Sequence, residues 1–193
     1  LSRVNAGAAR APVRVSRELY DLLATSTEYS KLTRGAFDIT YASVGHLYDY
    51  RAGVHPDDAS IAKALPGVNW RHLQLLPKYT AVRFSRPGMR VDLGGIGKGH
   101  AVDRGIAVLR QRGVDRAMVN AGGDTRIIGD RFGKPWIVGV RDPNSGGPDD
   151  GGKVALRLPL TDTAISTSGD YERYFEEDGV RYHHILDPQT GKS

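Results

Sequence analysis

The sequence contains no cysteine. Disulfide bonds, thiolate zinc sites and a cysteine nucleophile are therefore excluded, and any metal must be held by oxygen or imidazole ligands. No run of about 18 consecutive apolar residues is present, which is the length that a membrane-spanning helix requires. Residues 1–15 also lack the apolar segment of a secretory signal. We therefore expect a soluble chain without a signal or anchor, which contacts a membrane only through segments that it does not include.

Runs of basic residues interleaved with aromatics, which mark many nucleic-acid-binding surfaces, are also missing. The formal charge is +5 and the pI is about 9.5, but the Lys and Arg residues are scattered along the chain. Scattered basic residues are typical of a solvated surface, and their surplus can attract a ligand that carries phosphate. We therefore expect no nucleic-acid partner.

Size and composition favour one compact globular domain. Hydrophobic residues make up 39% of the 193 residues and charged residues 25%, which excludes disordered and collagen-like classes. The chain is long enough to bury a core and too short for two domains of ordinary size. We expect a single domain over residues 1–193.

Three segments carry the capping and periodicity signals of helices. The expected helices run between Ser16 and Gly35, from about Asp57 to residues 66–67, and from Gly99 to Gly113. The residues expected to face the core are Leu19, Leu22, Leu23, Tyr29 and Leu32 in the first helix, and Ala101, Val102, Ile106 and Leu109 in the third.

Short runs of β-branched and aromatic residues, separated by turns, predict strands. These strands are expected at residues 72–76, 80–85, 90–93, 117–120, 125–128, 136–140, 154–158, 164–167 and 180–186. Their short connections favour antiparallel pairing. Residues 142–152 have the composition of a flexible loop and are expected to form a hairpin excursion between two strands. The predicted fold class is α+β, a single domain of mixed, largely antiparallel sheets with packed helices.

Residues 92–100, DLGGIGKGH, form a glycine-rich segment that leads from an expected strand into a helix. Backbone amides at such a helix N-terminus favour a phosphate, although a tight structural turn explains the glycines equally well. A P-loop is excluded because it needs Gly where Asp92 stands and Ser or Thr where Gly99 stands. The glycine spacing also differs from the dinucleotide fingerprint.

Two further strand ends carry polar or glycine-rich turns. Residues 120–124, NAGGD, allow a ligand or another backbone to approach closely, and residues 164–170, AISTSGD, offer hydroxyls that can bond a ribose or phosphate. Each segment alone is more typical of an ordinary turn.

Residues 182–191, YHHILDPQTG, bring an imidazole, a carboxylate and a hydroxyl into one strand end and turn. Because strand residues alternate between faces, only one of His183 and His184 can face a site. We assign His184 and Asp187 as the functional pair and expect His183 at the surface or in packing. Asp187 and Thr190 offer hard oxygen ligands that suit magnesium better than zinc.

These segments resemble, in their residues and in their order, the segments of the ApbE family, the FAD:protein FMN transferases, and the resemblance extends from residue 1 to residue 191. The matching segments are residues 35–40 (GAFDIT), 92–103, 120–124, Trp136, Asp142 with Pro143, 166–169 (STSG) and 184–191 (HILDPQTG). The chain lacks the family's first strand, with its methionine-containing flavin contact, and its final strand and helix, so either the protein is longer than this sequence or it is a reduced form of the domain. Because the sequence opens within a pattern at Leu1 and stops directly after a turn at Ser193, we expect a piece of a longer protein. Residues 41–46, YASVGH, replace the family's proline-containing turn.

The resemblance implies an enzyme that uses Mg²⁺ to transfer FMN from FAD, its substrate, to a Thr or Ser hydroxyl of a target flavoprotein, with AMP as the leaving group. By motif position, the implied cofactor-binding residues are Ala36, Phe37, Asp38, Asp92, Lys98, Ser166 and Thr167; the implied metal ligands are Gly95 through its carbonyl, Asp187 and Thr190; and the implied catalytic residues are His184 and Asp187. The family also suggests the extracytoplasmic face of the inner membrane in the bacterial cell envelope.

The implied chemistry suits these residue types. A pyrophosphate repels an oxygen nucleophile until its charge is neutralised, which a magnesium ion, Lys98 and backbone amides can do. The acceptor hydroxyl must lose its proton, and a histidine side chain is suited to accept it. Asp187 can share that role where the metal leaves it free. The same residues also fit an FAD pyrophosphatase that gives FMN and AMP, or a non-catalytic flavin-binding module.

Overall fold

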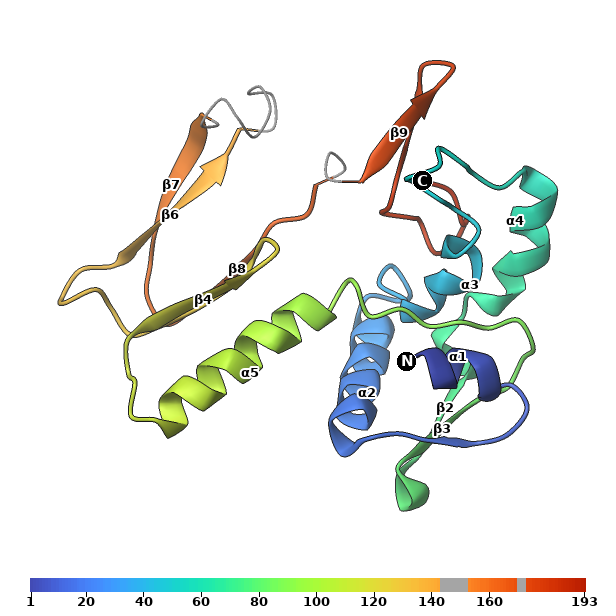
Figure 1. Ribbon diagram of the computed structural model, residues 1–193, viewed down its shortest axis with the longest axis horizontal. Coiled ribbons are helices and arrows are strands. Elements are labelled where there is room, and N and C mark those ends of the chain that lie inside the picture. Colours follow the sequence, from blue (N-terminus) through green and yellow to red (C-terminus); the bar gives the residue numbers. More distant parts are fainter. Residues whose placement is uncertain (143–152, 170–172) are drawn as a thin grey trace. The chain divides into compact units, whose positions relative to one another are not determined.

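The computed structural model describes residues 1–142, 153–169 and 173–193 (Figure 1). The described residues form two compact units, one of residues 1–95 and 173–193 and the other of residues 96–142 and 153–169. Both units combine helical and antiparallel elements, which confirms the predicted α+β class. The single domain expected over residues 1–193 stays a prediction, because each unit is compact on its own. The hairpin excursion expected at residues 142–152 lies, from residue 143 onward, outside the described residues.

The first unit contains most of the helical elements of the chain. Its elements are α1 (Ser2–Gly7), β1 (Val13–Arg14), α2 (Arg17–Leu32), η1 (Ile39–Tyr41), α3 (Ala42–Gly45), α4 (Asp58–Ala64), η2 (Leu65–Gly67), η3 (Trp70–His72), β2 (Leu73–Leu76), η4 (Pro77–Tyr79), β3 (Ala81–Phe84), β9 (Tyr174–Glu177) and β10 (Val180–His183). Strand β3 is the centre of an antiparallel sheet with the order β1-β3-β2, and β9 pairs with β10 as a hairpin. Elements α1, β1 and β9 were not predicted from the sequence.

Helix α2 begins and ends as its capping signals predict, but one of its faces was assigned wrongly. The Leu19 amide donates to Ser16 Oγ at 3.2 Å, as expected for an N-cap. Tyr29 and Leu32, expected to face the core, are 50% and 74% exposed, while Ser26 and Ser30 on the neighbouring face are fully buried. The two serines can be buried because each hydroxyl bonds the carbonyl four residues earlier in the helix.

Two other local predictions are confirmed. Asp57 caps α4, with its Oδ1 accepting a hydrogen bond from the Ser60 amide at 2.7 Å. The expected hairpin near residues 72–85 is the antiparallel pair of β2 and β3, in which Leu75 lies opposite Val82. The two strands are joined by η4, which starts at a proline and ends at a left-handed Thr80.

The strand predicted at residues 90–93 does not form. The backbone of this segment bonds two side chains and the Ile39 carbonyl rather than a neighbouring strand. Asn5 of α1 accepts from the Val91 amide at 2.8 Å and donates to the Val91 carbonyl at 3.0 Å. Ser43 Oγ accepts from the Arg90 amide, also at 3.0 Å. The apolar pattern of the segment correctly indicates burial, since Val91 is buried. The hydrogen-bond partners of the segment, however, come from helical segments and not from a strand.

We expect Asn5→Ala to lower the free energy of unfolding by about 2 kcal/mol, because it leaves two polar groups of a buried residue without their side-chain partner. Urea unfolding of the variant and the wild-type protein measures this change. Arg3→Ala, at an exposed position of the same helix, is the matched control. A change of less than about 0.5 kcal/mol for Asn5→Ala, which is usual for surface substitutions, would contradict the assigned role.

Two apolar clusters form the core of the first unit. The larger cluster packs α1 and α2 against β2 and β3, and its fully buried members include Leu23, Val82 and Phe84. The smaller cluster contains Val44, Tyr48, Ile61 and Leu186. Leu186 directly precedes Asp187, so the smaller cluster anchors the segment in which the functional pair was predicted.

In the second unit, one helix covers a small antiparallel sheet. Helix α5 (Gly97–Gln111) packs against β4 (Ala117–Ala121) and β5 (Asp124–Ile128), and β8 (Ala164–Ser166) completes this sheet in the order β4-β5-β8 (Figure 1). Strands β6 (Trp136–Arg141) and β7 (Val154–Leu160) form a separate antiparallel pair. All strands predicted in this unit are therefore present and antiparallel, as expected.

Helix α5 begins two residues earlier than Gly99, the predicted start, and stops before Gly113 as predicted. Val102 and Ile106 are buried as expected, whereas Ala101 is exposed and was placed on the wrong face. Among the described residues, no helix combines the length and the apolar character needed to cross a membrane.

Candidate active site

The turn at residues 187–191 gathers the carboxylate and hydroxyl that the sequence singled out. Asp187 Oδ2 accepts from Thr190 Oγ1 at 3.2 Å, and Asp187 Oδ1 accepts from the Gln189 amide at 2.8 Å. The chain leaves the turn at Gly191, which has a φ of +70° and packs against Ile61, so a side chain would not fit there. The oxygens of Asp187 and Thr190 are thus paired and exposed on a turn with a buried base.

The two neighbouring histidines have different surroundings. His184 Nδ1 lies 3.3 Å from the carbonyl oxygen of Arg173, which can only accept, so Nδ1 carries the proton in this bond. Nε2 of His184 then has a lone pair available for a proton. His183 ends β10, and its backbone amide donates to Ser193 Oγ at 2.7 Å. Its Nδ1 is buried without a hydrogen-bond partner in the described part of the chain, in line with the predicted packing role.

The glycine-rich segment forms a turn that Asp92 holds together. Asp92 Oδ1 accepts from the Gly94 amide at 2.7 Å and from the Tyr41 hydroxyl at 3.1 Å. The next glycine, Gly95, packs under a ring, since a Cβ built there would lie 3.2 Å from Phe37 Cε2. The structure thus brings the predicted flavin contact Phe37 and the predicted metal ligand Gly95 into direct contact.

Asp38 is a buried carboxylate with a full set of partners. Its Oδ1 accepts from the amide and the hydroxyl of Thr40 at 2.8 and 2.6 Å, and its Oδ2 accepts from the Trp70 amide at 2.8 Å. These bonds cap η1 and connect it to η3. The carboxylate therefore holds residues 38–40 in shape and joins them to Trp70.

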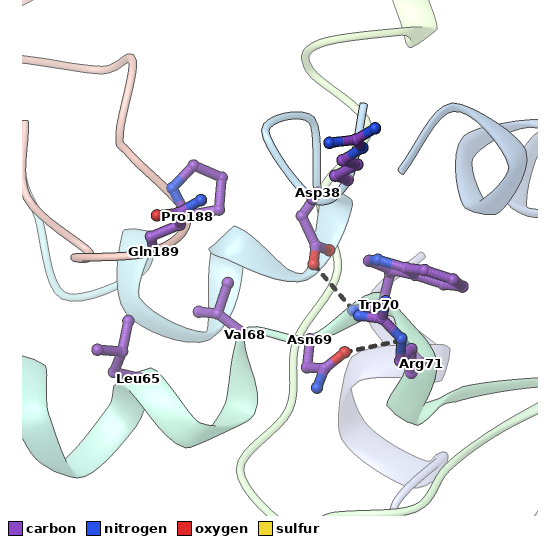
Figure 2. A pocket seen from close by; sticks show the side chains of 10 residues that line it. Asp38, Leu65, Val68, Asn69, Trp70, Arg71, Pro188 and Gln189 are labelled. Carbon is purple, nitrogen blue, oxygen red and sulfur yellow. Dashed lines mark hydrogen bonds between the residues drawn. The ribbon is translucent and has the colours of Figure 1, made fainter. Parts of the chain in front are cut away.

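A pocket of about 230 Å³ lies beside this carboxylate (Figure 2). Figure 2 shows Asp38 and Trp70 on one side of it and the side chains of Pro188 and Gln189 on the other. The guanidinium of Arg71 lies 4.4 Å from the centre of the Trp70 ring. The pocket wall therefore joins Gly35 and Asp38 of the Gly-Ala-Phe-Asp motif to the turn that carries the predicted metal ligands.

In the second unit, Lys98 lies in the first turn of α5. Its ammonium group donates to the Gly122 carbonyl at 2.7 Å, which ties the start of the helix to the tip of the β4–β5 hairpin. Within the described ranges, no side chain caps this end of α5. Free amides and a lysine with further donors make this end of the helix suitable for an anion.

Ser166 and Thr167 lie at the end of β8 beside the same hairpin tip. Ser166 Oγ donates to Asp124 Oδ1 at 2.6 Å, and the Thr167 amide donates to the Gly123 carbonyl at 3.3 Å. The segments 120–124 and 166–169, singled out separately from the sequence, are therefore one structural cluster. Asp124, which the sequence analysis treated only as part of a turn, orients one of the predicted hydroxyls.

The predicted site residues thus fall into two sets, each within one unit. The first unit holds Ala36, Phe37, Asp38, Asp92, Gly95, His184, Asp187 and Thr190, and the second holds Lys98, Ser166 and Thr167. Sequence reasoning missed Tyr41 and Tyr48, whose hydroxyls bond residues of the two turns in the first unit. Tyr41 lies in residues 41–46, which depart from the family pattern, whereas Tyr48 lies outside them and had no such signal.

The donors available for a metal ion are few. Over residues 1–142, 153–169 and 173–193, no three His, Asp or Glu side chains cluster in a way that suits a metal ion. Asp187 and Thr190 instead offer one carboxylate and one hydroxyl. Such a sparse set of hard oxygens fits Mg²⁺, which usually keeps several waters and completes its coordination with substrate phosphates.

Comparison with protein families and curated proteins gives a consistent result. The model of the ApbE family matches residues 1–193. The chain is 36% identical to an FAD:protein FMN transferase of Treponema pallidum, with 99% of this chain and 56% of that protein aligned. It is 35% identical to an FAD:protein FMN transferase of Klebsiella pneumoniae, with 97% and 57% aligned. The chain therefore spans a little more than half the length of these relatives.

Solved structures agree with the sequence comparisons. The ApbE protein of Thermotoga maritima superimposes with a TM-score of 0.90 at 38% identity, over 99% of this chain and 61% of that one. The flavin transferase ApbE of Vibrio cholerae gives a TM-score of 0.83 at 31% identity, over 100% and 61%. The predicted ApbE-like fold is confirmed. The family model covers the whole chain and the alignments with these relatives cover nearly all of it, so the chain belongs to the ApbE family.

Proposed function

We propose that the protein transfers FMN from FAD to a Thr or Ser hydroxyl of a target flavoprotein and releases AMP, with Mg²⁺ as the required metal. The observation that carries this proposal is the pairing of the Asp187 carboxylate with the Thr190 hydroxyl on an exposed turn. It gains weight from the relatives in Treponema pallidum and Klebsiella pneumoniae, which are named FAD:protein FMN transferases.

In this proposal the metal is held by Asp187, Thr190 and the Gly95 carbonyl, all of which belong to the first unit. When bound, Mg²⁺ neutralises charge on the pyrophosphate and so lowers its repulsion of an incoming oxygen. The turn prepares this set of ligands, because the Gln189 amide and the Thr190 hydroxyl orient both oxygens of the Asp187 carboxylate.

The flavin half of FAD is proposed to contact Ala36 and Phe37, while Asp38 keeps this segment in shape. The Phe37 ring lies next to Gly95, and aromatic side chains supply much of the contact area in ligand sites. Asp92 is assigned to the nucleotide side of the site. Its Oδ1 already accepts two hydrogen bonds, so Oδ2 is the atom that remains for a ligand group such as a ribose hydroxyl.

A phosphate contact is proposed for the second unit. The Lys98 ammonium group has three N–H donors. One donates to the Gly122 carbonyl, and two remain for a ligand oxygen. The uncapped amides at the start of α5 add a favourable field for an anion. Ser166 and Thr167 supply hydroxyls that can bond a ribose or phosphate oxygen.

The transfer step conserves charge and atoms as follows. The acceptor oxygen forms a bond to the FMN phosphorus, while the bond between this phosphorus and the bridging oxygen breaks. AMP leaves with the bridging oxygen and the electron pair of the broken bond. The proton of the acceptor hydroxyl passes to Nε2 of His184, which is the free ring nitrogen when Nδ1 bonds the Arg173 carbonyl.

Product analysis with the full-length protein tests the proposal. With FAD, Mg²⁺ and a threonine-containing peptide of a candidate flavoprotein, we expect covalent FMN on the peptide by mass spectrometry and one AMP for each peptide labelled. The same peptide with valine in place of threonine, and a reaction with EDTA, are expected to give no label. Release of FMN and AMP without acceptor would identify a pyrophosphatase instead, and intact FAD after hours would identify a non-catalytic flavin-binding module.

A further inference from the structure

The segment 41–48 connects the two turns that carry the proposed metal ligands. It contains α3 and is flanked by tyrosines whose hydroxyls reach in different directions. The Tyr41 hydroxyl donates to Asp92 Oδ1 at 3.1 Å, and the Tyr48 hydroxyl donates to the Gly191 carbonyl at 3.0 Å. One short segment thus bonds the glycine turn through one tyrosine and the 187–191 turn through the other.

Tyr41 acts on the glycine turn through a carboxylate. Asp92 Oδ1 accepts both the Tyr41 hydroxyl and the Gly94 amide, so this tyrosine, the carboxylate and the backbone next to Gly95 form one connected group. Burial, reinforced by the negative charge of Asp92, raises the pKa of the Tyr41 phenol. The hydroxyl therefore keeps the proton that it donates to Asp92 at neutral pH.

Tyr48 acts on the other turn through the backbone. It is buried at 9% exposure, and its ring stacks on Tyr50 with ring centres 5.7 Å apart. Its partner Gly191 donates its amide to the Asp187 carbonyl at 2.8 Å, which closes the turn that bears Thr190. Burial raises the pKa of the Tyr48 phenol as well, so this hydroxyl also remains a donor.

The segment between these tyrosines is closely packed and hydrogen-bonded to its neighbours. Val44 is fully buried in the cluster that includes Leu186, the residue before Asp187. The Tyr41 ring lies so close to Gly45 that a Cβ there would be 3.0 Å from Tyr41 Cε2. Ser43 Oγ donates to the Gly67 carbonyl at 3.0 Å, which fixes the segment to η2. A segment held in this way can transmit position between its two ends.

We propose that Tyr41 and Tyr48 are positioning residues, and that the segment 41–48 sets the spacing between the Gly95 carbonyl and the oxygens of Asp187 and Thr190. This inference rests on the proposed function, because it gives that spacing a role in metal binding. In this proposal neither tyrosine needs to contact the substrate. Each acts through one hydrogen bond to a group that shapes a turn, in the way that outer partners orient metal ligands.

Phenylalanine substitutions test this proposal, because they remove only the hydroxyls. Mn²⁺ binding to full-length protein is measured by electron paramagnetic resonance, with the metal alone and with FAD. We expect Tyr41→Phe to weaken Mn²⁺ binding about tenfold, since it removes a hydrogen bond to a charged group, and Tyr48→Phe about threefold. Tyr79→Phe, at a tyrosine that is 54% exposed in the same unit, is the matched control and is expected to change nothing.

The remaining outcomes separate positioning from general stability. We expect transfer activity lost in the double variant to return at higher Mg²⁺ concentration, with the melting temperature close to that of the wild type. Unchanged Mn²⁺ affinity in the double variant would overturn the proposal, as would a loss that Mg²⁺ does not rescue. Wild-type protein that binds Mn²⁺ without labelling an acceptor would defeat the proposed transferase function alone, and the variants would still decide the role of the tyrosines.

Discussion

Asp187→Ala is expected to lower kcat/KM for Mg²⁺-dependent FMN transfer by about 10³-fold or more. The substitution removes the only carboxylate among the proposed metal ligands and takes away the acceptor of the Thr190 hydroxyl's hydrogen bond. Loss of a preorganised group that neutralises charge in the transition state typically costs about 10²- to 10³-fold, and loss of a metal ligand adds to this. Initial rates of peptide labelling, measured over a range of Mg²⁺ concentrations, give the change.

Asp187→Asn separates the charge of this residue from its shape. The amide keeps an oxygen that can accept from the Gln189 amide, so the turn is expected to persist while the negative charge is lost. We expect nearly the same loss of activity as with alanine, together with a wild-type melting temperature. Asp178→Asn, at an exposed left-handed position in the β9–β10 turn, is the matched control. Full activity of Asp187→Asn would remove the residue from the proposed metal site.

His184→Ala is expected to lower the transfer rate by about 10²-fold, which is typical for the loss of a general base. The expectation follows from the Nδ1 bond to the Arg173 carbonyl, which leaves Nε2 to accept the proton of the acceptor hydroxyl. Added imidazole is expected to restore part of the rate, because it can take the proton in place of the missing ring. Rates with and without imidazole, at saturating FAD and Mg²⁺, measure this effect.

His183→Ala is the natural comparison for the neighbouring histidine. Its ring nitrogen Nδ1 is buried, and its backbone is bonded to Ser193, so the residue is placed for packing. We expect a much smaller effect on the rate than with His184→Ala, and no response to imidazole. Equal losses from the two substitutions would contradict the assignment of His184 as the proton acceptor.

Elements whose signals lie close together in the sequence were predicted well. Helices α2 and α4 begin at the capping residues Ser16 and Asp57, and the β2–β3 hairpin turns at residues 77–79. The buried faces were harder to predict. Tyr29 and Leu32 are exposed while Ser26 is buried. The burial of Ser26 was not predicted because hydrophobicity alone does not show that a serine can satisfy its hydroxyl within its own helix.

The candidate site also has features that could be predicted from the sequence and features that could not. The pairing of Asp187 with Thr190 spans only three residues, and the resemblance to the ApbE family was readable in the sequence before any coordinates. The contact of Phe37 with Gly95 and the clustering of Ser166 with Asp124 join distant segments, and only the fold revealed them. The roles of these residues in binding FAD and metal stay predictions.

The sequence by itself determined the family, through the order of its motifs along the chain. It also determined the capped helices, the strands and the turn at residues 187–191, because each of these is encoded by neighbouring residues. Only the tertiary structure decided what supports the site. Tyr41 bonds a residue 51 positions away and Tyr48 one 143 positions away, and Asn5 replaces a strand as the partner of Val91. Local patterns carry no information about such partners, because packing of the whole chain selects which distant polar groups meet.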